Sequence, residues 1–423
     1  MPSASSAKRR YLGTVYDDAW LLDGLRTPFA DYNSALGQVS ATDLGIAVAK
    51  ALLTRTGVDP ETVETVVGSN MAQTSFDAYY VPRHIGLYAG LRIESPAVGV
   101  QRLCGSGFEA IAQAADNIQL GKLASALAVG TESMSRNPIA AYTHRGGFPL
   151  GGVDFRDFLW ESTMDTASST AMGHTAENLA KRYDIPREAV DAFAAESFAR
   201  ACEAWDSGFY DEEVIALENQ RFEREGYNTR ELKLKRGVES FSHDEHVRPT
   251  SLEVLGKLRP AFSRDGVQTG GNSSAIVDGA AACLVATRDY AREQDIEPKA
   301  RILAAAAAGV PPEIMGIGPV PAIQGVLELA GLTLDDIDRF DINEAFGAQY
   351  LVVEKELGLD RSKVNVNGGG IAIGHPLGAT GVRCTVTVAR ELQRTGLRYG
   401  ISSACAGGGQ GIAILVENPD AGV

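Results

Sequence analysis

Apolar and polar positions follow two patterns along the chain: short apolar runs and longer amphipathic stretches. The apolar runs at 123–129, 282–286 and 412–416 predict buried strands. Amphipathic spacing predicts helices over 108–120 and 381–393. Because the two patterns alternate, the sequence predicts an α/β fold whose sheet is largely covered by helices.

A similar arrangement of residues occurs twice. In the first half, Gly57 follows an apolar run and leads to Asn70 after 13 positions. In the second half, Gly331 follows an apolar run and leads to Asn343 after 12 positions. Two copies are too few for a solenoid, so we expect two related halves that pack together.

A second matched pair supports the duplication. Cys104-Gly-Ser-Gly107 precedes one predicted helix, and Gly378-Ala-Thr-Gly381 precedes the other. We place the N-terminal half at 1–134 plus 266–296 and the C-terminal half at 297–423.

The segment 135–265 differs from both halves because it is rich in charged and aromatic residues. Helical patterns occur in it at 175–182 and 189–205. It is too long for a plain loop, so it should have its own secondary structure. Insertions of this kind often shape a substrate site.

Composition and charge limit the classes of function. Over 423 residues, 44% are hydrophobic and 22% charged, the balance of a globular protein with two to four packed units. No apolar run reaches the roughly 18 residues that span a bilayer, so we expect a soluble protein with no membrane span. The formal net charge of −15 argues against nucleic acid or an anionic membrane as a partner. An anionic ligand would need a local basic site, and the run Arg230 to Arg236 is either such a site or a strand with a solvated charged face.

The five cysteines show no CxxC spacing, which favours neither a disulfide framework nor a zinc site. This pattern indicates a reducing compartment, and we expect the cytoplasm. Residues 1–10 include serines and three basic residues but no apolar core, so they are only a weak candidate for a targeting segment. The mitochondrial or peroxisomal matrix is therefore the alternative.

Cys104 is a candidate nucleophile. Small residues follow it, and then the amphipathic run from Phe108 begins. If a helix starts at Gly105 to Gly107, the thiol lies at the positive end of the helix dipole, where N–H groups favour a thiolate. Alternatively, Cys104 is a small buried apolar residue between strand and helix.

His375 lies in the glycine-rich stretch 367–381, which is typical of a tight loop that approaches a ligand closely. A histidine there can accept a thiol proton and afterwards hydrogen-bond a carbonyl oxygen. Alternatively, it is a structural histidine whose ring is bonded to the backbone.

Cys405 and Asn343 complete the set of candidates. Gly407 and the two glycines after it leave N–H groups free to face an oxyanion, and a thiol there could act as an acid and a base or could form a disulfide. Asn343 follows the strand-like run 340–342 and can donate an N–H, hold a water or simply cap a turn.

Taken together, these segments resemble the thiolase family. The resemblance rests on Cys-Gly-Ser-Gly at 104–107, Asn-Glu-Ala-Phe at 343–346, Gly-His-Pro-Leu-Gly-Ala-Thr-Gly at 374–381 and Cys-Ala-Gly-Gly-Gly-Gln-Gly at 405–411. They occur in the family's order and spacing, and the resemblance spans about residues 20–417. It implies two βαβαβαββ halves in αβαβα layers, with 135–265 as a loop domain that binds coenzyme A.

The resemblance also implies a role for each residue. Cys104 would be the acylated nucleophile activated by His375, and Cys405 the acid and base at the α-carbon of acetyl-CoA. One oxyanion hole would use His375 and a water held by Asn343, and the other the N–H groups of Cys104 and Gly407. By the same resemblance, Ser274 would contact pantetheine, and Met315 and Phe346 would line the acyl end of the site.

The implied activity is reversible thiolysis of a 3-oxoacyl-CoA, or Claisen condensation of acetyl-CoA, with no metal or redox cofactor. Acyl-CoA, acetyl-CoA and coenzyme A would be the partners, and the protein a homodimer or homotetramer. One departure concerns Ala171-Met172-Gly173, where many biosynthetic thiolases have His-Met-Gly; here His174 follows instead. This puts a strict acetoacetyl-CoA preference in doubt.

Two other functions stay open at this point. A decarboxylating β-ketoacyl synthase is a related condensing enzyme, but such enzymes lack the second cysteine. A non-catalytic acyl-CoA binding or lipid-transfer protein would need no second thiol. Cys405 and Asn343 therefore favour the thiolase.

Overall fold

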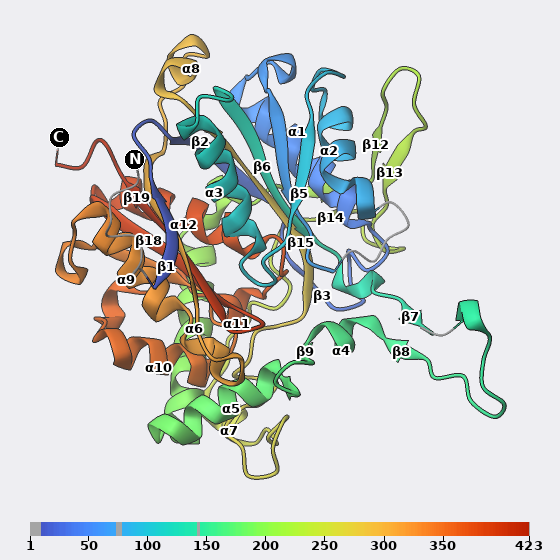
Figure 1. The fold of residues 1–423 in the computed structure, drawn as a ribbon, viewed down its shortest axis with the longest axis vertical. Helices are drawn as coiled ribbons and strands as arrows, with labels where there is room; N and C mark the ends of the chain where they lie inside the picture. The colour runs from blue at the N-terminus through green and yellow to red at the C-terminus, as the bar shows by residue number, and fades with distance from the viewer. Residues whose placement is uncertain (1–9, 73–77, 142–143, 423) are drawn as a thin grey trace.

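A computed structural model describes residues 10–72, 78–141 and 144–422. Five layers follow one another, helix, sheet, helix, sheet and helix, and an arm projects from the body (Figure 1). The predicted α/β fold with αβαβα layering is confirmed. Most of the candidate targeting segment, residues 1–9, lies outside the described residues.

The N-terminal half contains a five-stranded mixed sheet. Its strands, in spatial order, are β5 (Ala97–Val100), β4 (Thr65–Ser69), β6 (Ser125–Glu132), β15 (Val277–Ala286) and β2 (Trp20–Arg26). β5, β4 and β6 are parallel, whereas β15 is antiparallel to both its neighbours. The short β3 (Ala30–Asp31) also pairs with β15.

The C-terminal half repeats this plan. Its strands, in spatial order, are β17 (Arg339–Ile342), β18 (Tyr399–Ala406), β19 (Gln410–Glu417), β16 (Ala300–Gly309) and β1 (Tyr11–Val15). β17 and β18 are parallel, and β19 is antiparallel to β18 and β16. A two-residue pairing of β16 with β2 joins the sheets.

Helices cover the outer face of each sheet. α1 (Ala41–Thr56) and α2 (Val81–Ala89) pack on the first sheet, and α9 (Pro319–Ala330) and α10 (Gly347–Leu357) lie on the outer side of the second. α1 begins at Ser40, whose hydroxyl accepts the Asp43 N–H at 3.1 Å, and ends at Gly57, whose φ of 71° suits glycine. Because both faces of the sheets are covered, β15 is buried along its whole length.

Two helices, α3 (Ser106–Gln119) and α12 (Thr380–Thr395), lie between the sheets. Both predicted helices and the three predicted strands are thereby confirmed, with ends shifted by a few residues. Glycines let the two helices touch: a Cβ on Gly107 would lie 2.8 Å from the Gly378 oxygen, and one on Gly381 2.0 Å from the Phe108 nitrogen. The residues that precede each helix are therefore held close to the other helix.

The segment 135–265 has secondary structure of its own. Its first part forms the arm and the short elements in and near it (Figure 1). These are the strands β7 (Ile139–Ala140), β8 (Arg156–Asp157), β9 (Met164–Asp165) and β10 (Thr170–Ala171) and the helix α4 (Phe158–Ser162). Its second part comprises α5 (Met172–Tyr183), α6 (Arg187–Asp206), β11 (Leu217–Glu218), β12 (Gln220–Phe222), β13 (Arg230–Leu232), β14 (Ser240–Phe241) and α7 (Leu252–Gly256). The division of the chain at 135 and 265 stays a prediction. Outside this segment lie two further short helices, α8 (Arg288–Glu293) and α11 (Gly370–Ile373).

Buried ion pairs tie this segment to the core. The Arg26 guanidinium, at the end of β2, donates to Asp244 Oδ1 at 2.6 Å, to Asp244 Oδ2 at 2.8 Å and to Glu213 Oε1 at 2.6 Å. All three side chains are buried. Each buried charge has a partner of opposite sign, which offsets the cost of burial. Removing only one partner would leave the other charge buried without a counter-charge and would lower the stability of the fold.

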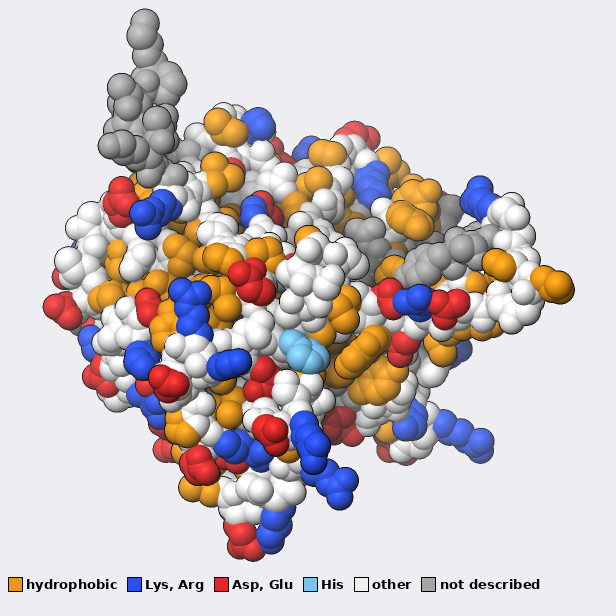
Figure 2. Space-filling model, turned by 60° about the horizontal axis from the view of Figure 1, so that its bottom comes forward, with side chains coloured by type: hydrophobic (Ala, Val, Ile, Leu, Met, Phe, Trp, Pro, Cys, Tyr) orange, Lys and Arg blue, Asp and Glu red, His pale blue; other side chains and the backbone are white. Residues whose placement is uncertain are grey.

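The run Arg230 to Arg236 begins as strand β13 and leaves the strand after Leu232; its cations Arg230 and Lys233 are paired with carboxylates, which favours the charged face over a basic site. Leu232 and Leu234 are buried in the core of the N-terminal half, and Arg230 donates to Asp43 Oδ1 at 2.7 Å. On the face drawn in Figure 2, Lys and Arg side chains are interspersed with Asp and Glu. Among the described residues, no helix is both long and apolar enough to cross a membrane.

Candidate active site

Cys104 lies at the tip of a sharp turn between β5 and α3. Leu103, directly before it, has a φ of 49°, an uncommon left-handed conformation for a leucine. Ser106 holds the turn closed, because its hydroxyl donates to the Leu103 oxygen at 2.6 Å and accepts the Arg102 N–H at 2.8 Å. The turn therefore presents the thiol just before the first residue of the helix.

The Cys104 thiol opens into a cavity of about 240 Å³. Besides a carboxylate and several hydroxyl groups of residues 162–166, apolar and small residues line it, among them Met71, Met164, Met172, Leu377 and Gly407. The first of these belongs to the N-terminal half, the next two to the segment 135–265 and the last two to the C-terminal half. The predicted role of an insertion in shaping the site is thus visible in the lining.

Burial raises the pKa of the Cys104 thiol to about 11, although the N–H groups of Gly407 and of Cys104 itself bond to the sulfur and oppose that rise. The N–H groups at the helix start thus favour the thiolate, as expected, but they do not decide the protonation state. Desolvation of the charged form outweighs the N–H groups. These same two N–H groups are the ones expected to form an oxyanion hole.

His375 lies in a buried loop directly before α12. Its Nδ1 lies 2.6 Å from the Thr380 hydroxyl, and that hydroxyl donates to the Pro376 oxygen at 3.1 Å. Since the hydroxyl has one hydrogen, Nδ1 is the donor to Thr380 and Nε2 carries the lone pair. Nε2 is buried and has no hydrogen-bond partner among the described residues.

The imidazole of His375 is neutral. Burial, followed by the charge of Arg383, lowers the pKa of His375 to about 3. A neutral ring with a bare Nε2 can accept a proton. Leu377, two residues further on, lines the Cys104 cavity, so the loop lies beside the thiol.

Asn343 follows β17 and is fully buried. Its backbone N–H donates to the Ser403 oxygen at 2.8 Å, which fixes the residue beside β18. Neither Nδ2 nor Oδ1 of its amide has a partner among the described residues. Because unpaired buried polar groups are costly, this amide is suited to bind a polar atom of a substrate or a water.

Cys405 lies at the end of β18, buried beside Met315, Ala345 and the partly buried Phe346. Burial, and then the nearby Cys104, raise the pKa of this thiol above its usual range. The two cysteines are therefore neighbours, and both are free thiols. The turn after Cys405 needs glycine, since Gly408 and Gly409 have φ values of 70° and 77°.

The three predicted substrate contacts lie around Cys405. Met315 and Phe346 belong to its apolar cluster, and the Ser274 N–H donates to the Ala345 oxygen at 3.0 Å. Phe262 packs edge-on against Phe346 with ring centres 5.8 Å apart. The sequence-predicted residues thus gather from both halves into one region.

Two comparisons with known sequences agree on what this chain is. Residues 20–289 match the thiolase N-terminal domain, and residues 296–418 match the thiolase C-terminal domain. Human mitochondrial 3-ketoacyl-CoA thiolase is 44% identical over 395 residues, which cover 93% of this chain and 96% of the human protein. The chain belongs to the thiolase family.

Other thiolases extend this result. An acetyl-CoA acetyltransferase of Allochromatium vinosum is 41% identical over 399 residues, covering 94% of this chain and 98% of that protein. The crystal structure of human mitochondrial 3-ketoacyl-CoA thiolase in complex with CoA matches with a TM-score of 0.90 at 42% identity, covering 97% of this chain and all of that one (100%). The predictions of a thiolase fold and of an acyltransferase enzyme are confirmed.

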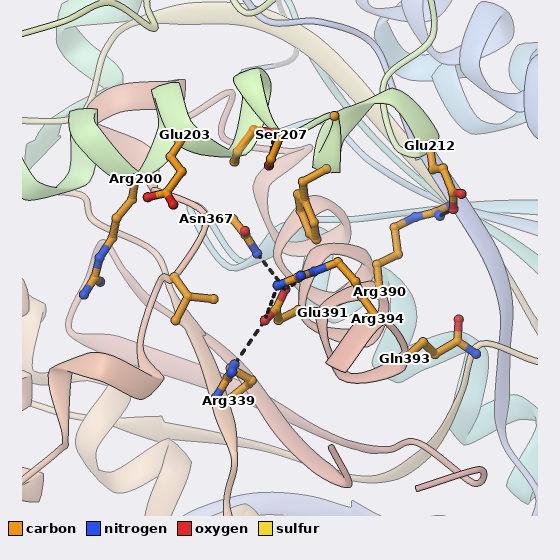
Figure 3. Close-up of a pocket in the computed structure, with 14 residues that line it drawn as sticks. Arg200, Glu203, Ser207, Glu212, Arg339, Asn367, Arg390, Glu391, Gln393 and Arg394 are labelled. Carbon is orange, nitrogen blue, oxygen red and sulfur yellow. Dashed lines mark hydrogen bonds and ion pairs between the residues drawn. The ribbon is translucent and has the colours of Figure 1, made fainter. Parts of the chain in front are cut away.

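A larger cavity of about 700 Å³ lies away from the thiols of this thiolase (Figure 3). Arg390 and Arg394 line it from the last turns of α12, roughly 15 Å along the helix from Thr380 at its start. Its arginines are already paired; Glu391, for example, accepts from Arg394 at 2.9 Å and from Arg339 at 3.2 Å. Size alone therefore does not mark the active site.

His174 is exposed on α5 and touches Phe262, with ring centres 6.2 Å apart. Met172, by contrast, lines the Cys104 cavity. Sequence reasoning missed Thr380, which orients the imidazole, and Glu132, which bonds to the loop of His375. The internal duplication of the sequence could have revealed both residues. Each of them lies in or beside a segment that has a counterpart in the other half.

Proposed function

We propose that this thiolase transfers acyl groups between coenzyme A thioesters, by thiolysis of a 3-oxoacyl-CoA and, in reverse, by Claisen condensation of acetyl-CoA. The observation that carries the proposal is the surroundings of the Cys104 thiol: it opens into a cavity, two N–H groups bond to its sulfur, and the buried Cys405 thiol lies near it. Acyl transfer needs a nucleophile and an oxyanion hole, and carbon–carbon chemistry needs an additional acid and base.

In the first step, Cys104 attacks the 3-keto carbonyl while Nε2 of His375 takes the thiol proton. With pKa values of about 11 for Cys104 and about 3 for His375, the resting pair is thiol and imidazole. Proton transfer therefore accompanies formation of the carbon–sulfur bond rather than preceding it. The hydrogen bond from Nδ1 to Thr380 keeps Nε2 free to act as the base.

Collapse of the tetrahedral adduct breaks the bond between C2 and C3, and the electron pair passes to the enolate of acetyl-CoA. Cys405 protonates the α-carbon and becomes a thiolate. It then takes the proton of incoming coenzyme A, whose sulfur attacks the acyl group on Cys104. The departing Cys104 sulfur recovers its proton from His375, so the cycle closes and no metal or redox cofactor is needed.

Two oxyanion holes stabilise the negative charge that develops in these steps. The N–H groups of Cys104 and Gly407 face the oxygen on the Cys104-bound carbonyl. Nε2–H of the protonated His375, and Asn343 through a water, face the thioester oxygen of the enolate. The buried amide of Asn343, to which no described residue bonds, supports this assignment.

We propose that the segment 135–265 binds coenzyme A, with Ser274 in contact with pantetheine and Met315 and Phe346 at the acyl end. The lining of the cavity by Met164 and Met172, and the CoA complex of the human relative, support this. Because similar relatives are named both 3-ketoacyl-CoA thiolase and acetyl-CoA acetyltransferase, the acyl length and direction are open to assay.

The test is thiolysis of a series of 3-oxoacyl-CoA lengths by the whole protein and by Cys104→Ala. We expect the variant to lose turnover of every substrate, and Cys202→Ala, a partly buried thiol on α6, to keep it. Full activity in Cys104→Ala would refute the proposal. Condensation that depends on a malonyl thioester would favour the synthase alternative, and bound acyl-CoA with no turnover in the wild type would favour a binding protein.

Cys405→Ala separates the two thiols. It should slow exchange of the α-protons of acetyl-CoA with solvent more than it slows acylation of Cys104. Equal slowing of both steps would contradict the assigned role of Cys405.

We propose that the protein is a homodimer or homotetramer. Within the part of the chain that the structure describes, β5 ends the sheet with no strand on its outer side, and the arm leaves Ile139, Phe155 and Trp160 exposed. Light scattering after gel filtration measures the mass directly, and a monomer would refute this. Among compartments, the cytoplasm stays our prediction, while the names of the mammalian relatives favour the mitochondrial alternative.

A further inference from the structure

The duplication relates the active site to a second position in the fold. Ser69 of β4 pairs with Gly130 of β6, and the corresponding pair in the other half is Ile342 of β17 with Ser403 of β18. One residue beyond the first strand lie Asn70 and Asn343, respectively. Glu132 lies two residues after Gly130 in β6, and Cys405 lies two residues after Ser403 in β18. Glu132 is thus the counterpart of the second catalytic thiol.

The central helices give the third pair. Cys104 lies two residues before the first residue of α3, and Gly378 lies two residues before the first residue of α12. Asn70, Glu132 and Gly378 therefore repeat Asn343, Cys405 and Cys104. We name these three residues the mirror site.

The mirror site is filled by its own carboxylate. Glu132 is fully buried, and Oε2 accepts the Gly378 N–H at 2.8 Å and the Met71 N–H at 3.0 Å. Oε1 accepts Asn70 Nδ2 at 2.9 Å and the Ala72 N–H at 3.1 Å. All four contacts are donors, which an ionised carboxylate satisfies and a carboxylic acid or amide does not.

No substrate could enter there. A Cβ on Gly378 would lie 2.6 Å from the Thr131 oxygen and 2.9 Å from the Ser69 oxygen, so this position has no room for a thiol. The Ser69 hydroxyl also donates to the Gly378 oxygen at 2.7 Å. Both backbone groups of Gly378 are therefore held by the N-terminal half. At the active site, by contrast, the amide of Asn343 has no partner in the described ranges of the chain.

We propose that Glu132 is a positioning residue for the thiolase reaction: by binding the Gly378 N–H, its carboxylate fixes the loop of His375 against the half of the fold that carries Cys104. Gly378 is three residues from His375, and it belongs to the same turn that leads into α12. Glu132 thus acts through His375 and does not touch the reacting atoms. The inference rests on the proposed function.

The charge of Glu132 also reaches Cys104. It contributes to the raised pKa of the Cys104 thiol, after the larger effect of burial. Burial and the neighbouring Asp278 raise the pKa of Glu132 itself to about 7, while its N–H donors oppose them. Removing the charge should therefore make the thiol more easily ionised while loosening the loop that carries the base.

Glu132→Gln tests this because loosening the loop should lower the turnover rate, whereas removing the charge should make the Cys104 thiol more reactive. We expect kcat for thiolysis to fall about a hundredfold, with KM changed far less, because a loop shift of about 1 Å can cost that much. The rate at which iodoacetamide alkylates Cys104 above pH 7, where the Glu132 carboxylate is ionised, should rise, as followed by the mass of the Cys104 peptide. Asp278→Asn is the matched control: it removes a buried carboxylate that bonds to Ser135 and not to the His375 loop, and kcat should stay within about threefold of wild type.

The outcomes separate the two levels of inference. A wild-type protein that turns over no 3-oxoacyl-CoA contradicts the proposed function. An active wild type whose Glu132→Gln variant keeps kcat, or loses kcat without the rise in alkylation of Cys104, overturns the role of Glu132. If Glu132→Gln does not fold, Glu132→Asp replaces it; a folded Asp variant with wild-type kcat would overturn the role equally, since its shorter side chain cannot reach all four donors.

Discussion

Gly381 lies where the two central helices touch, and replacing it by alanine should separate Cys104 from His375. A Cβ at this position would lie 2.0 Å from the Phe108 nitrogen and 2.5 Å from the Gly107 carbonyl carbon. Ordinary contact begins at 3.4 Å, so the helices must move apart by about 1.4 Å, and backbone atoms cannot rotate out of the way. Such overpacking costs about 3 kcal/mol, and the better helix propensity of alanine returns about 1 kcal/mol. We expect Gly381→Ala to lower the free energy of unfolding by roughly 2 kcal/mol.

The same movement should lower activity. Cys104 lies two residues before α3, and His375 lies in the loop that leads into α12, so moving the helices apart should also move the nucleophile away from the base. A displacement of about 1 Å can cost a hundredfold in rate, and we expect a loss of at least that size in kcat/KM for thiolysis.

Urea unfolding followed by circular dichroism measures the first effect, and steady-state thiolysis of a 3-oxoacyl-CoA measures the second. The matched control is Gly256→Ala at the end of α7, where a Cβ would meet nothing within 4 Å; it should change stability by less than about 1 kcal/mol and leave activity unchanged. If Gly381→Ala unfolds and turns over like the wild type, the close approach of the helices does not set the active-site geometry.

Three further predictions concern single groups. The pKa of His375 is lowered from 6.5 to about 3, so its contribution to stability is complete above pH 6.5 and declines as the pH falls toward 3. By about pH 4.5 the wild type should have lost roughly 3 kcal/mol of unfolding free energy that His375→Asn does not lose. Parallel curves of unfolding free energy against pH for the two proteins would contradict this. Thr380→Val removes the acceptor of His375 Nδ1 and should lower kcat about tenfold at similar stability, while Thr380→Ser should restore it; equal kcat in all three proteins would show that the hydroxyl does not orient the ring. Arg26→Ala removes the cation that pairs with two buried carboxylates and should lower the unfolding free energy by roughly 3 to 5 kcal/mol. Arg398→Ala, which removes an exposed ion pair, should lower it by less than about 1 kcal/mol. Similar losses in the two variants would contradict the argument.

Several features could be predicted from the sequence because they depend on local chemistry. The helices after Cys104 and Gly378 follow from amphipathic spacing. The glycines after Cys405 marked a place where backbone N–H groups are free to face a ligand, and Gly408 and Gly409 do adopt positive φ values there. The run Arg230 to Arg236 shows the limit of such reasoning, because two interpretations fitted it equally. Its leucines pack into the core, and this packing depends on residues far away in the chain.

The active site divides in the same way. Cys104, His375, Asn343 and Cys405 were recognisable as candidates because their residue types and glycine-rich surroundings carry chemistry wherever they lie. Their protonation states were not recognisable, because burial acts on the whole environment of a group. It is burial that raises the pKa of Cys104 against the N–H groups of the helix start, and that lowers the pKa of His375.

The amino-acid order alone therefore establishes the family, the duplication and the reactive groups, since each is a short pattern that reads the same in any environment. The folded chain establishes how those groups work together. It brings residues from both halves and from the segment 135–265 around one cavity, buries the amide of Asn343 with no partner among the residues that the structure describes, and places the Glu132 carboxylate against the backbone of the loop that carries His375. Such contacts join residues more than 200 positions apart, and their strength comes from the exclusion of water, which no local pattern records.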